Sequence, residues 1–422
     1  MAPRPRTIPK KTPNPWPGIK NRIRGYKEQM VAFQRDLTAI PALGPQNGGK
    51  GEYAKALYLE KQLKALSPQT ILNLGCPDPR VPQGIRSNLL ALFEGQNSSR
   101  TIWILSHMDI VPIGDRRLWK TDPYKMKRKG DFLYGRGVED DQHGIVSSYF
   151  AVKALKEEGV RPAHPVGLLW VSDEETGSHK GLEYFLRKKR NLFKVEDLII
   201  VPDAGNQEGT MIEVAEKSLL WMKFTLSGRQ CHGSRPDLGI NTLRGTAHFI
   251  TALEKLPRIF KKKNPHFDLP ISTFEPTQKE ANVPNVNTIP GQDIFYLDCR
   301  VMPEYPLSKV IDAIKSIAAE VEKKTGLVIK IEVVNTVQAP PATKADDPVV
   351  LALQKAVQAV HHKKAFPLGI GGGTVAAFFR EVGLPAAVWF TSSDTAHQPN
   401  EFCRISHLLK DAQIFAHIFC QS

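Results

Sequence analysis

Four apolar, β-rich runs constrain the fold of this chain most strongly, because each ends in a cluster of acidic or histidine residues. The runs are residues 101–105, 166–171, 198–201 and 386–390. Continuous apolar runs of this length, alternating with helical stretches, are typical of buried strands in an α/β sheet. In open α/β sheets, ligands bind just beyond the carboxyl ends of the strands. The four clusters therefore predict one shared site.

Apolar residues at three- and four-residue spacing predict helices between these strands. We expect them over residues 53–66, 141–158, 178–190 and 372–381. The sequence pattern changes in the middle of the chain, where the expected strands and helices follow one another in an order typical of a small α+β domain. The strands expected there are 219–226, 295–301 and 328–334, and the helices are 241–256 and 308–325.

These patterns predict two domains, as the length of 422 residues also favours. The larger one is an α/β domain of residues 25–216 and 338–422, with a mixed central sheet flanked by helices. Residues 217–337 form the inserted α+β domain. Its borders are set by the change of sequence pattern and by Pro340-Pro341, in the linker that leads back to the larger domain.

Composition excludes several classes of protein. With 41% hydrophobic and 24% charged residues, the chain is an ordinary soluble globular protein. No apolar run approaches the ~20 residues that cross a bilayer, and there is no secretory signal, so we expect a cytoplasmic protein without a membrane partner. The cysteines are odd in number and lack C-x-x-C spacing, which argues against a disulfide framework or a thiolate zinc site.

The formal net charge of +14 is concentrated at the N-terminus. Residues 1–24 contain seven basic and no acidic side chains, among prolines that oppose regular structure. We expect a basic, Pro-rich leader that is disordered. An arm that binds nucleic acid is the less favoured alternative, since no nucleic-acid-binding motif appears elsewhere.

Candidate ligands follow the first strand and precede the next helix. Along an extended chain His107 and Asp109 point to the same side, so the carboxylate can orient the imidazole. A surface turn explains this pair as well. Asp140 lies in a run of three acids at the start of a helix, where helix capping is the structural alternative. Helix capping alone does not require three consecutive acidic residues.

Glu174 and Glu175 form the most informative cluster. Adjacent carboxylates repel each other at a strand end unless a cation or water compensates them, so one can bind a metal while the other activates water. A solvated acidic turn is the alternative. Asp203 and His397 follow the remaining two strands and complete a set of imidazole and carboxylate ligands, which suits zinc, with cobalt or manganese as substitutes.

The order of the motifs resembles that of the co-catalytic zinc hydrolases. This family includes glutamate carboxypeptidase, acetylornithine deacetylase, succinyl-diaminopimelate desuccinylase, aminoacylase and carnosinase-like dipeptidases. The motifs are S-H-M-D, Y-G-R-G-x-x-D-D, S-D-E-E-x-G-S, V-P-D-A-G, N-T-I-P-G, D-x-R-x-x-P, G-G-G-T and H-x-x-N-E. They cover nearly the whole chain from about residue 25.

The resemblance implies a role for each candidate. His107 and Asp203 would bind one zinc ion, Glu175 and His397 the other, and Asp140 would bridge the two. Asp109 would support His107. Glu174 would act as general base, taking a proton from the attacking water and handing it to the leaving nitrogen of an amide substrate.

The inserted domain resembles the family's lid and dimerisation domain. The resemblance implies that His232 reaches the active site of a partner subunit and stabilises the developing oxyanion. It implies that Asn287 and Arg300 hold the substrate carboxylate or carbonyl, although a turn role for Asn287 is a close alternative. Backbone N–H groups of Gly373 and Thr374, before a helix, are expected to receive a substrate carboxylate.

Three functions remain open at this point. The first is hydrolysis of an amide bond in a dipeptide or N-acyl amino acid, by a homodimer with two Zn²⁺ per subunit. The second is a dedicated biosynthetic deacylase for acetylornithine or succinyl-diaminopimelate; Asp rather than Glu at position 203 favours an aminoacylase over a desuccinylase. The third is a noncatalytic binding protein, which the presence of every ligand and of the base opposes.

Overall fold

The computed structural model describes residues 15–421, which divide into two compact units. Unit 1 comprises the residues up to Ile212, Lys344–Phe366 and the residues from Val382 onward. Unit 2 comprises Glu213–Thr343 and Pro367–Glu381. The second segment of unit 2 lies within the region that the sequence analysis assigned to the larger domain.

The main sheet is mixed and has the strand order β1-β4-β8-β5-β9-β18-β10-β17. Most of its strands lie in unit 1, while most residues of β10 and β17 belong to unit 2. The four strands expected from the sequence are its central neighbours, listed along the sheet as β8 (Val166–Val171), β5 (Ile102–His107), β9 (Leu198–Asn206) and β18 (Ala386–Thr391). They pair in parallel, with β5 between β8 and β9, and β18 against β9. Their carboxyl ends therefore lie along one edge of the sheet, as predicted.

The remaining strands of this sheet are short and were not expected from the sequence. They are β1 (Thr70–Asn73), β4 (Leu89–Phe93), β10 (Met211–Glu216) and β17 (Phe366–Ile370). Two small sheets accompany them, formed by β2 (Cys76–Pro77) with β3 (Ile85–Arg86), and by β6 (Lys127–Lys129), β7 (Phe132–Tyr134) and β19 (Phe402–Arg404). β4 runs antiparallel to β8, which makes the main sheet mixed.

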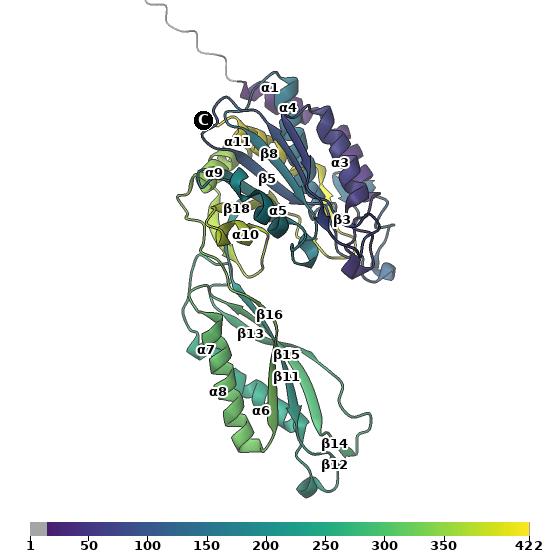
Figure 1. Cartoon of the computed structure of the whole chain (residues 1–422), viewed down its shortest axis with the longest axis vertical. Helices are drawn as coiled ribbons and strands as arrows, with labels where there is room; N and C mark the ends of the chain where they lie inside the picture. The colour runs from purple at the N-terminus through teal and green to yellow at the C-terminus, as the bar shows by residue number, and fades with distance from the viewer. Residues whose placement is uncertain (1–14, 422) are drawn as a thin grey trace, which may run out of the picture. The chain divides into compact units, whose positions relative to one another are not determined.

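Helices surround this sheet (Figure 1). They are α1 (Trp16–Arg24), α2 (Lys27–Thr38), α3 (Tyr53–Ala65), α4 (Gln142–Glu157), α5 (Leu182–Lys189), α9 (Pro348–His361) and α11 (Ile405–Phe419). All residues of β5, β8 and β18 are buried, as continuous apolar strands covered by helices should be. α5 begins four residues later than expected, because residues 172–181 form a turn that carries acidic side chains.

The expectation of a disordered leader through residue 24 is wrong for its last part, because residues 16–24 form α1. Pro17 lies in the first turn of the helix, where its missing N–H costs no hydrogen bond. Ile19 and Ile23 are fully buried, and Arg22 donates to Glu158 at 2.6 Å. Residues 1–14 of the expected leader lie outside the described residues.

Unit 2 is an α+β unit with a four-stranded sheet in the order β13-β15-β11-β16. Its strands are β13 (Thr273–Lys279), β15 (Gln292–Val301), β11 (Ser218–Ser227) and β16 (Val328–Val337). Buried and less buried residues alternate along β11 and β15, so the sheet has one core face. α6 (Thr242–Leu253) and α8 (Leu307–Thr325) cover that face (Figure 1).

Four shorter elements complete unit 2. They are α7 (Leu256–Ile259), α10 (Ala376–Glu381) and the two-stranded pair β12 (Cys231–His232) with β14 (Thr288–Ile289). α10 is shorter than the helix expected over residues 372–381, because the glycines at 371–373 lie outside it.

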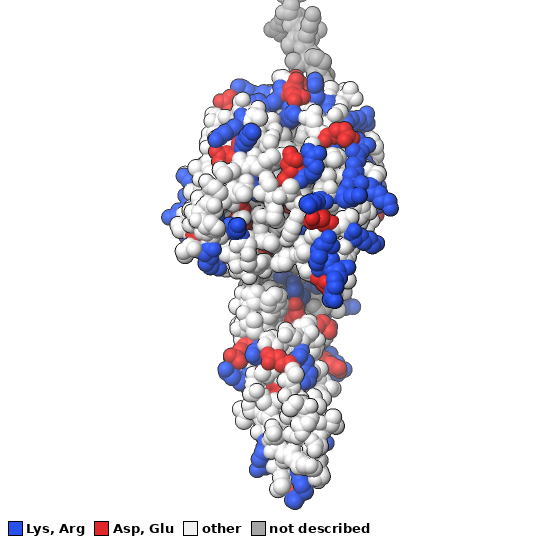
Figure 2. Space-filling model, turned by 90° about the vertical axis from the view of Figure 1, so that its right-hand side faces the viewer, with Lys and Arg blue, Asp and Glu red and all other residues white. Residues whose placement is uncertain are grey.

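Charged side chains of both signs cover the face shown in Figure 2, where Lys and Arg outnumber Asp and Glu over unit 1. Among residues 15–421, no helix is both long and apolar enough to cross a membrane. Because charged groups are normally solvated, buried carboxylates in this protein require a specific explanation.

Candidate metal centre

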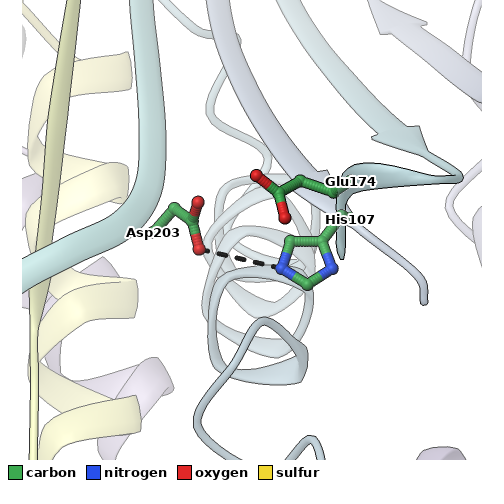
Figure 3. Close-up of side chains that lie close together, drawn as sticks. All are labelled: His107, Glu174 and Asp203. Atoms are coloured by element: carbon green, nitrogen blue, oxygen red, sulfur yellow. Dashed lines mark ion pairs between the residues drawn. The ribbon is translucent and has the colours of Figure 1, made fainter. Parts of the chain in front are cut away.

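The ends of adjacent strands bring the first candidate ligands together. His107 is the last residue of β5, and Asp203 lies in β9. The His107 Nε2 atom is 2.7 Å from Asp140 Oδ1 and 3.7 Å from Asp203 Oδ1. Figure 3 shows His107, Asp203 and Glu174 converging on one point. Two strands and the loop before α4 thus supply one group of donor atoms.

The second group forms around His397, in the loop that follows β18. Its Nε2 atom lies 3.0 Å from Asp140 Oδ2 and 3.1 Å from Glu175 Oε2. Asp140 therefore contacts one imidazole with each of its carboxylate oxygens. This geometry is what a carboxylate between two metal positions requires.

The donor atoms fit metal binding in number and chemistry. Two overlapping groups, His107-Glu174-Asp203 and His107-Asp140-Glu175, each have ligand atoms within 4.8 Å of one another. Imidazole nitrogen and carboxylate oxygen suit zinc and related divalent ions. Glu174 is as well placed as the expected ligands, although the sequence analysis assigned it the role of base. All these residues belong to unit 1.

The three consecutive acids before α4 have three different contacts. Asp141 caps α4 by accepting from Gly144 N at 3.1 Å, and it also accepts from His107 N at 3.1 Å. Glu139 accepts from Thr395 N at 2.8 Å and so holds the loop that leads to His397. Asp140 faces the histidines. Capping is thus the task of Asp141, which leaves Asp140 available to a metal ion.

A close approach of α4 to the sheet makes this arrangement possible. Gly144 lies in the first turn of α4, and a Cβ atom there would be 2.4 Å from both Asp141 Oδ1 and Pro202 Cγ. Only glycine avoids these overlaps.

Asp109 supports the glutamates as well as the histidine. His107 Nδ1 lies 3.0 Å from the backbone oxygen of Asp109 and 3.6 Å from its carboxylate. The two carboxylate oxygens accept from Glu174 N at 3.1 Å and Glu175 N at 3.0 Å. The expected support of His107 thus comes from the backbone oxygen of Asp109, with its carboxylate 3.6 Å away, and the contacts to the glutamates were not expected. Asp109 therefore links the turn that carries the glutamates to the end of β5.

The imidazoles lie among negative charges. Burial opposes protonation of His107, but hydrogen bonds to carboxylates, above all Asp109, raise its pKa well above the ordinary value. Hydrogen bonds to Asp140 and Glu175 raise the pKa of His397 to about 10. A metal ion would take the place of these protons, since metal ligands bind in their deprotonated forms.

The glutamates are shifted by burial and by one another. Burial and then the charge of Asp140 raise the pKa of Glu175 to about 7. Burial and then the charge of Asp203 raise the pKa of Glu174 well above its ordinary value. A divalent cation between these groups would compensate both effects. The site thus has the excess of buried negative charge that a metal centre needs.

Two further buried residues complete the support of the site, and the sequence analysis did not assign them a role. Glu401 Oε1 accepts from Glu139 N at 3.0 Å and Asp140 N at 3.3 Å. Its other oxygen accepts from Arg136 Nη1 at 2.5 Å and Gly137 N at 3.1 Å. Both residues stand in the quoted motifs, but only tertiary contacts show that they position the loop of Asp140.

A cavity of about 360 Å³ adjoins the donor atoms, also within unit 1. Asp140, Asp203, Phe390 and Asp394 are among its lining residues. Its volume is in the range of small-molecule sites.

The remaining expected residues lie in unit 2 and have local partners. His232 is exposed, with Nδ1 2.8 Å from Ser234 Oγ, and Asn287 accepts from Asn285 Nδ2 at 2.5 Å. Arg300 donates to Asp298 Oδ1 at 2.8 Å and to the Gly371 carbonyl oxygen at 3.1 Å.

The glycine-rich segment also has an internal partner. Thr374 donates to Glu216 Oε1 through its N–H at 3.0 Å and its hydroxyl at 2.7 Å. Gly373 lies beside the same carboxylate. An internal glutamate therefore takes the N–H group expected for a substrate.

Comparison with known proteins agrees with this site. Residues 103–421 match peptidase family M20/M25/M40. An uncharacterised metallohydrolase of Methanococcus maripaludis is 39% identical over 416 residues, which cover 94% of this chain and 100% of the relative. Succinyl-diaminopimelate desuccinylase 1 of a Ruegeria species is 26% identical, covering 92% of this chain and 97% of its own.

The fold agrees with a solved structure. The crystal structure of human carnosine dipeptidase 1 superposes with a TM-score of 0.70 at 17% identity, covering 96% of this chain and 98% of its own. The family match extends over most of the chain and includes the candidate ligands. The chain belongs to peptidase family M20/M25/M40 and is a metal-dependent hydrolase.

Proposed function

We propose that this protein hydrolyses the amide bond of a dipeptide or an N-acyl amino acid, using two Zn²⁺ per subunit. One observation carries the proposal. Four imidazole and carboxylate side chains and an additional glutamate converge at the ends of four adjacent parallel strands, and Asp140 joins them from the loop before α4, in a family of metal-dependent hydrolases. His107 and Asp203 would hold one ion, and Glu175 and His397 the other.

Asp140 would bridge the two ions, because each of its oxygens is near one histidine. Bound metal supplies the positive charge that acidifies water and polarises the substrate carbonyl. Glu174 accepts a proton from the attacking water and passes it to the leaving nitrogen. Asp109 orients Glu174 because its carboxylate accepts a hydrogen bond from the backbone N–H group of Glu174.

The cavity beside Asp140 and Asp203 supports a small substrate rather than a protein substrate. Relatives at similar identity include a desuccinylase and a rat aminoacylase, both named for removing an acyl group from nitrogen. A dedicated biosynthetic deacylase is the second candidate for this reason. A panel of N-acetyl and N-succinyl amino acids and dipeptides separates the two, since a dedicated enzyme should prefer one substrate by several orders of magnitude in kcat/KM.

Glu174→Gln tests the proposed base. The change keeps the side chain's size and removes its basicity, so turnover should fall by roughly 10² to 10⁴-fold while the metal content stays unchanged. Turnover and elemental analysis on the same preparation measure both. Retained activity would exclude Glu174 as the base, and lost metal would make it a ligand instead.

Metal dependence is tested on protein purified without added metal. Elemental analysis should find zinc, cobalt or manganese, and a chelator should abolish amidase activity that Zn²⁺ or Co²⁺ then restores. Absence of such metals, with no activity after their addition, would refute the proposal.

A homodimer with shared sites is part of the proposal, and so is a cytoplasmic location. β16 is an edge strand of unit 2 with exposed Val328, Val333 and Val334, and such edges favour pairing with another chain. If His232 serves the partner's site, mixing inactive His232→Ala with inactive Glu174→Gln subunits should restore activity. Mixed dimers without activity would show that His232 acts in its own subunit or not at all.

A further inference from the structure

The turn of residues 172–180 carries both glutamates of the site and has an unusual backbone. It follows β8 and contains a single short 3₁₀ turn, Glu174–Thr176. Asp173 and Ser178 adopt left-handed conformations, with φ of 64° and 61°. This conformation is unfavourable for non-glycine residues, which keep it only where neighbouring groups hold it. The position of Glu174 and Glu175 therefore depends on what holds the turn.

Asp173 accepts several of the hydrogen bonds within the turn. Its carboxylate accepts from Lys180 N at 2.9 Å and from the Thr176 hydroxyl. Its backbone oxygen accepts from Ser178 N at 2.6 Å. The side chain is 2% exposed, so the carboxylate needs a buried positive partner.

Arg86 supplies that partner from the end of β3. Its Nη1 atom is 3.2 Å from Asp173 Oδ1, and its guanidinium is fully buried. The other side of the same group binds both carboxylate oxygens of Glu52, with Nε donating to Oε2 at 2.6 Å. Glu52 directly precedes α3. One planar guanidinium thus joins the start of α3 to the turn with the glutamates.

Asn88 holds the same turn from two residues further along. Its Oδ1 atom accepts from Ser172 N at 3.1 Å, and its Nδ2 donates to the Lys180 carbonyl oxygen at 3.0 Å. Arg86 therefore holds the turn near its start, at Asp173, and Asn88 holds both of its ends. Asp109 holds it from the other side, through the N–H groups of the glutamates.

Fold stability is a weak explanation for this arrangement. Buried ion pairs often contribute little net stability, because desolvation offsets their attraction. Here one guanidinium is surrounded by three carboxylates, those of Glu52, Asp173 and, at 3.7 Å, Asp78. What such a cluster provides is a fixed position for the groups that it joins.

We propose that Arg86 is a positioning residue for the hydrolytic reaction: it places Glu174 and Glu175 through Asp173 without touching metal or substrate. The inference rests on the proposed function. The guanidinium can bind Glu52 and Asp173 at once because its donors form a planar fork, whereas a lysine ammonium is a point charge on a flexible stem. Arg86→Lys therefore keeps the charge and loses the bridge.

The chain offers a matched control in Arg80. This residue binds the Asp78 carboxylate at 2.7 Å, but its side chain is 48% exposed. Arg80→Lys makes the same chemical change beside the same cluster, at a position with no hydrogen bond to residues 172–180 among those described.

The test compares wild type, Arg86→Lys and Arg80→Lys. Arg86→Lys should lower kcat about 10 to 100-fold, as a misplacement of about 1 Å does, with KM changed less than about threefold. The visible absorption spectrum of the Co²⁺-loaded protein should also change, because Glu175 moves relative to the metal. Arg80→Lys should match wild type in kcat and in spectrum.

Wild-type kcat and spectrum in folded Arg86→Lys would overturn the inference. If circular dichroism shows that this variant does not fold, Asp173→Asn replaces it, since it keeps the side-chain shape and weakens the same link. Wild-type kcat in Asp173→Asn would then overturn it. A wild-type protein without metal-dependent amidase activity would refute the proposed function instead, and the Co²⁺ spectra would still report on the turn.

Discussion

Both units of the molecule bury carboxylates, and the candidate metal centre of unit 1 compensates them differently from the Arg380 cluster of unit 2. In unit 2 the side chain of Arg380 donates to both oxygens of Glu213, at 2.9 and 3.0 Å, and lies 3.6 Å from Glu216. In unit 1 the carboxylates of the candidate metal centre face two imidazoles and one another. Buried carboxylates that are paired with a guanidinium and hydroxyl groups need no bound ligand to compensate their negative charge. Acids in excess need a cation.

The pKa shifts alone do not separate the two clusters. Burial and the charge of Glu213 raise the pKa of Glu216 to about 7. Burial and the charge of Asp140 raise that of Glu175 to about 7 as well. Perturbed carboxylates occur in structural networks and in functional sites. The identity of the neighbouring groups is what distinguishes a metal centre.

Asp140→Asn should have the largest effect of the changes that test this comparison, on both bound metal and turnover. Each carboxylate oxygen is close to one histidine, and an amide cannot bridge two cations as a carboxylate does. We expect loss of bound metal and a fall in turnover of roughly 10³-fold or more, because metal ions contribute several kcal/mol of transition-state stabilisation. Elemental analysis and steady-state kinetics measure the two effects.

Glu213→Gln is the matched control in unit 2, since it also removes one buried carboxylate charge. Its metal content per folded molecule should equal that of wild type. The contrast between the units breaks down if Glu213→Gln loses metal or if Asp140→Asn retains it.

Arg380→Met should destabilise the protein strongly. The change removes the guanidinium that binds Glu213, and leaving one partner of a buried pair uncompensated costs about 3 to 5 kcal/mol. Calorimetry or urea denaturation measures the loss. Combining it with Glu213→Gln should recover a large part of that free energy.

The exposed pair Lys255–Glu320 provides the comparison within unit 2, because its side chains are 52% and 61% exposed. Lys255→Met should have a much smaller effect, since solvent screens this pair. Equal losses in Arg380→Met and Lys255→Met would show that burial of the Glu213–Arg380 pair has no energetic consequence.

Glu216→Gln should have a smaller effect than Arg380→Met, and one that depends on pH. The folded pKa of about 7 lies above the ordinary value of 4.5, so the folded state binds a proton more tightly than the unfolded chain. This contribution to stability is complete below pH 4.5 and is lost as the pH rises through 7. Above pH 7 the variant should be more stable than wild type, by up to roughly 3 kcal/mol.

Unfolding free energies between pH 4.5 and 8 test this expectation, with Glu275→Gln on the exposed side of β13 as the control. The control should keep the wild-type pH dependence. An unchanged slope in Glu216→Gln would show that Glu216 is ionised in the folded protein across this range.

Local patterns were sufficient for the centre of the fold. Apolar runs identified β5, β8, β9 and β18, because strands buried on both faces are continuously apolar. The flanking strands lack that signal, since β1 has only four residues and the apolar residues of β10 are interrupted by Glu213. α1 was missed because Pro17 was taken to oppose a helix, although a first-turn proline is compatible with one.

The sequence by itself determined which residue types stand at the strand ends, and hence that His107, Glu175, Asp203 and His397 form one candidate site, to which the motif before a helix adds Asp140. The resemblance assigns different roles to Glu174 and Glu175, and this assignment stays a prediction. Only the tertiary structure decided what each supporting residue does. Asp141 caps α4, Glu401 holds the loop of Asp140, and Glu216 takes the N–H group of Thr374. The contacts of Glu401 and Glu216 join residues far apart in the chain, so spacing along the sequence carries no signal for them.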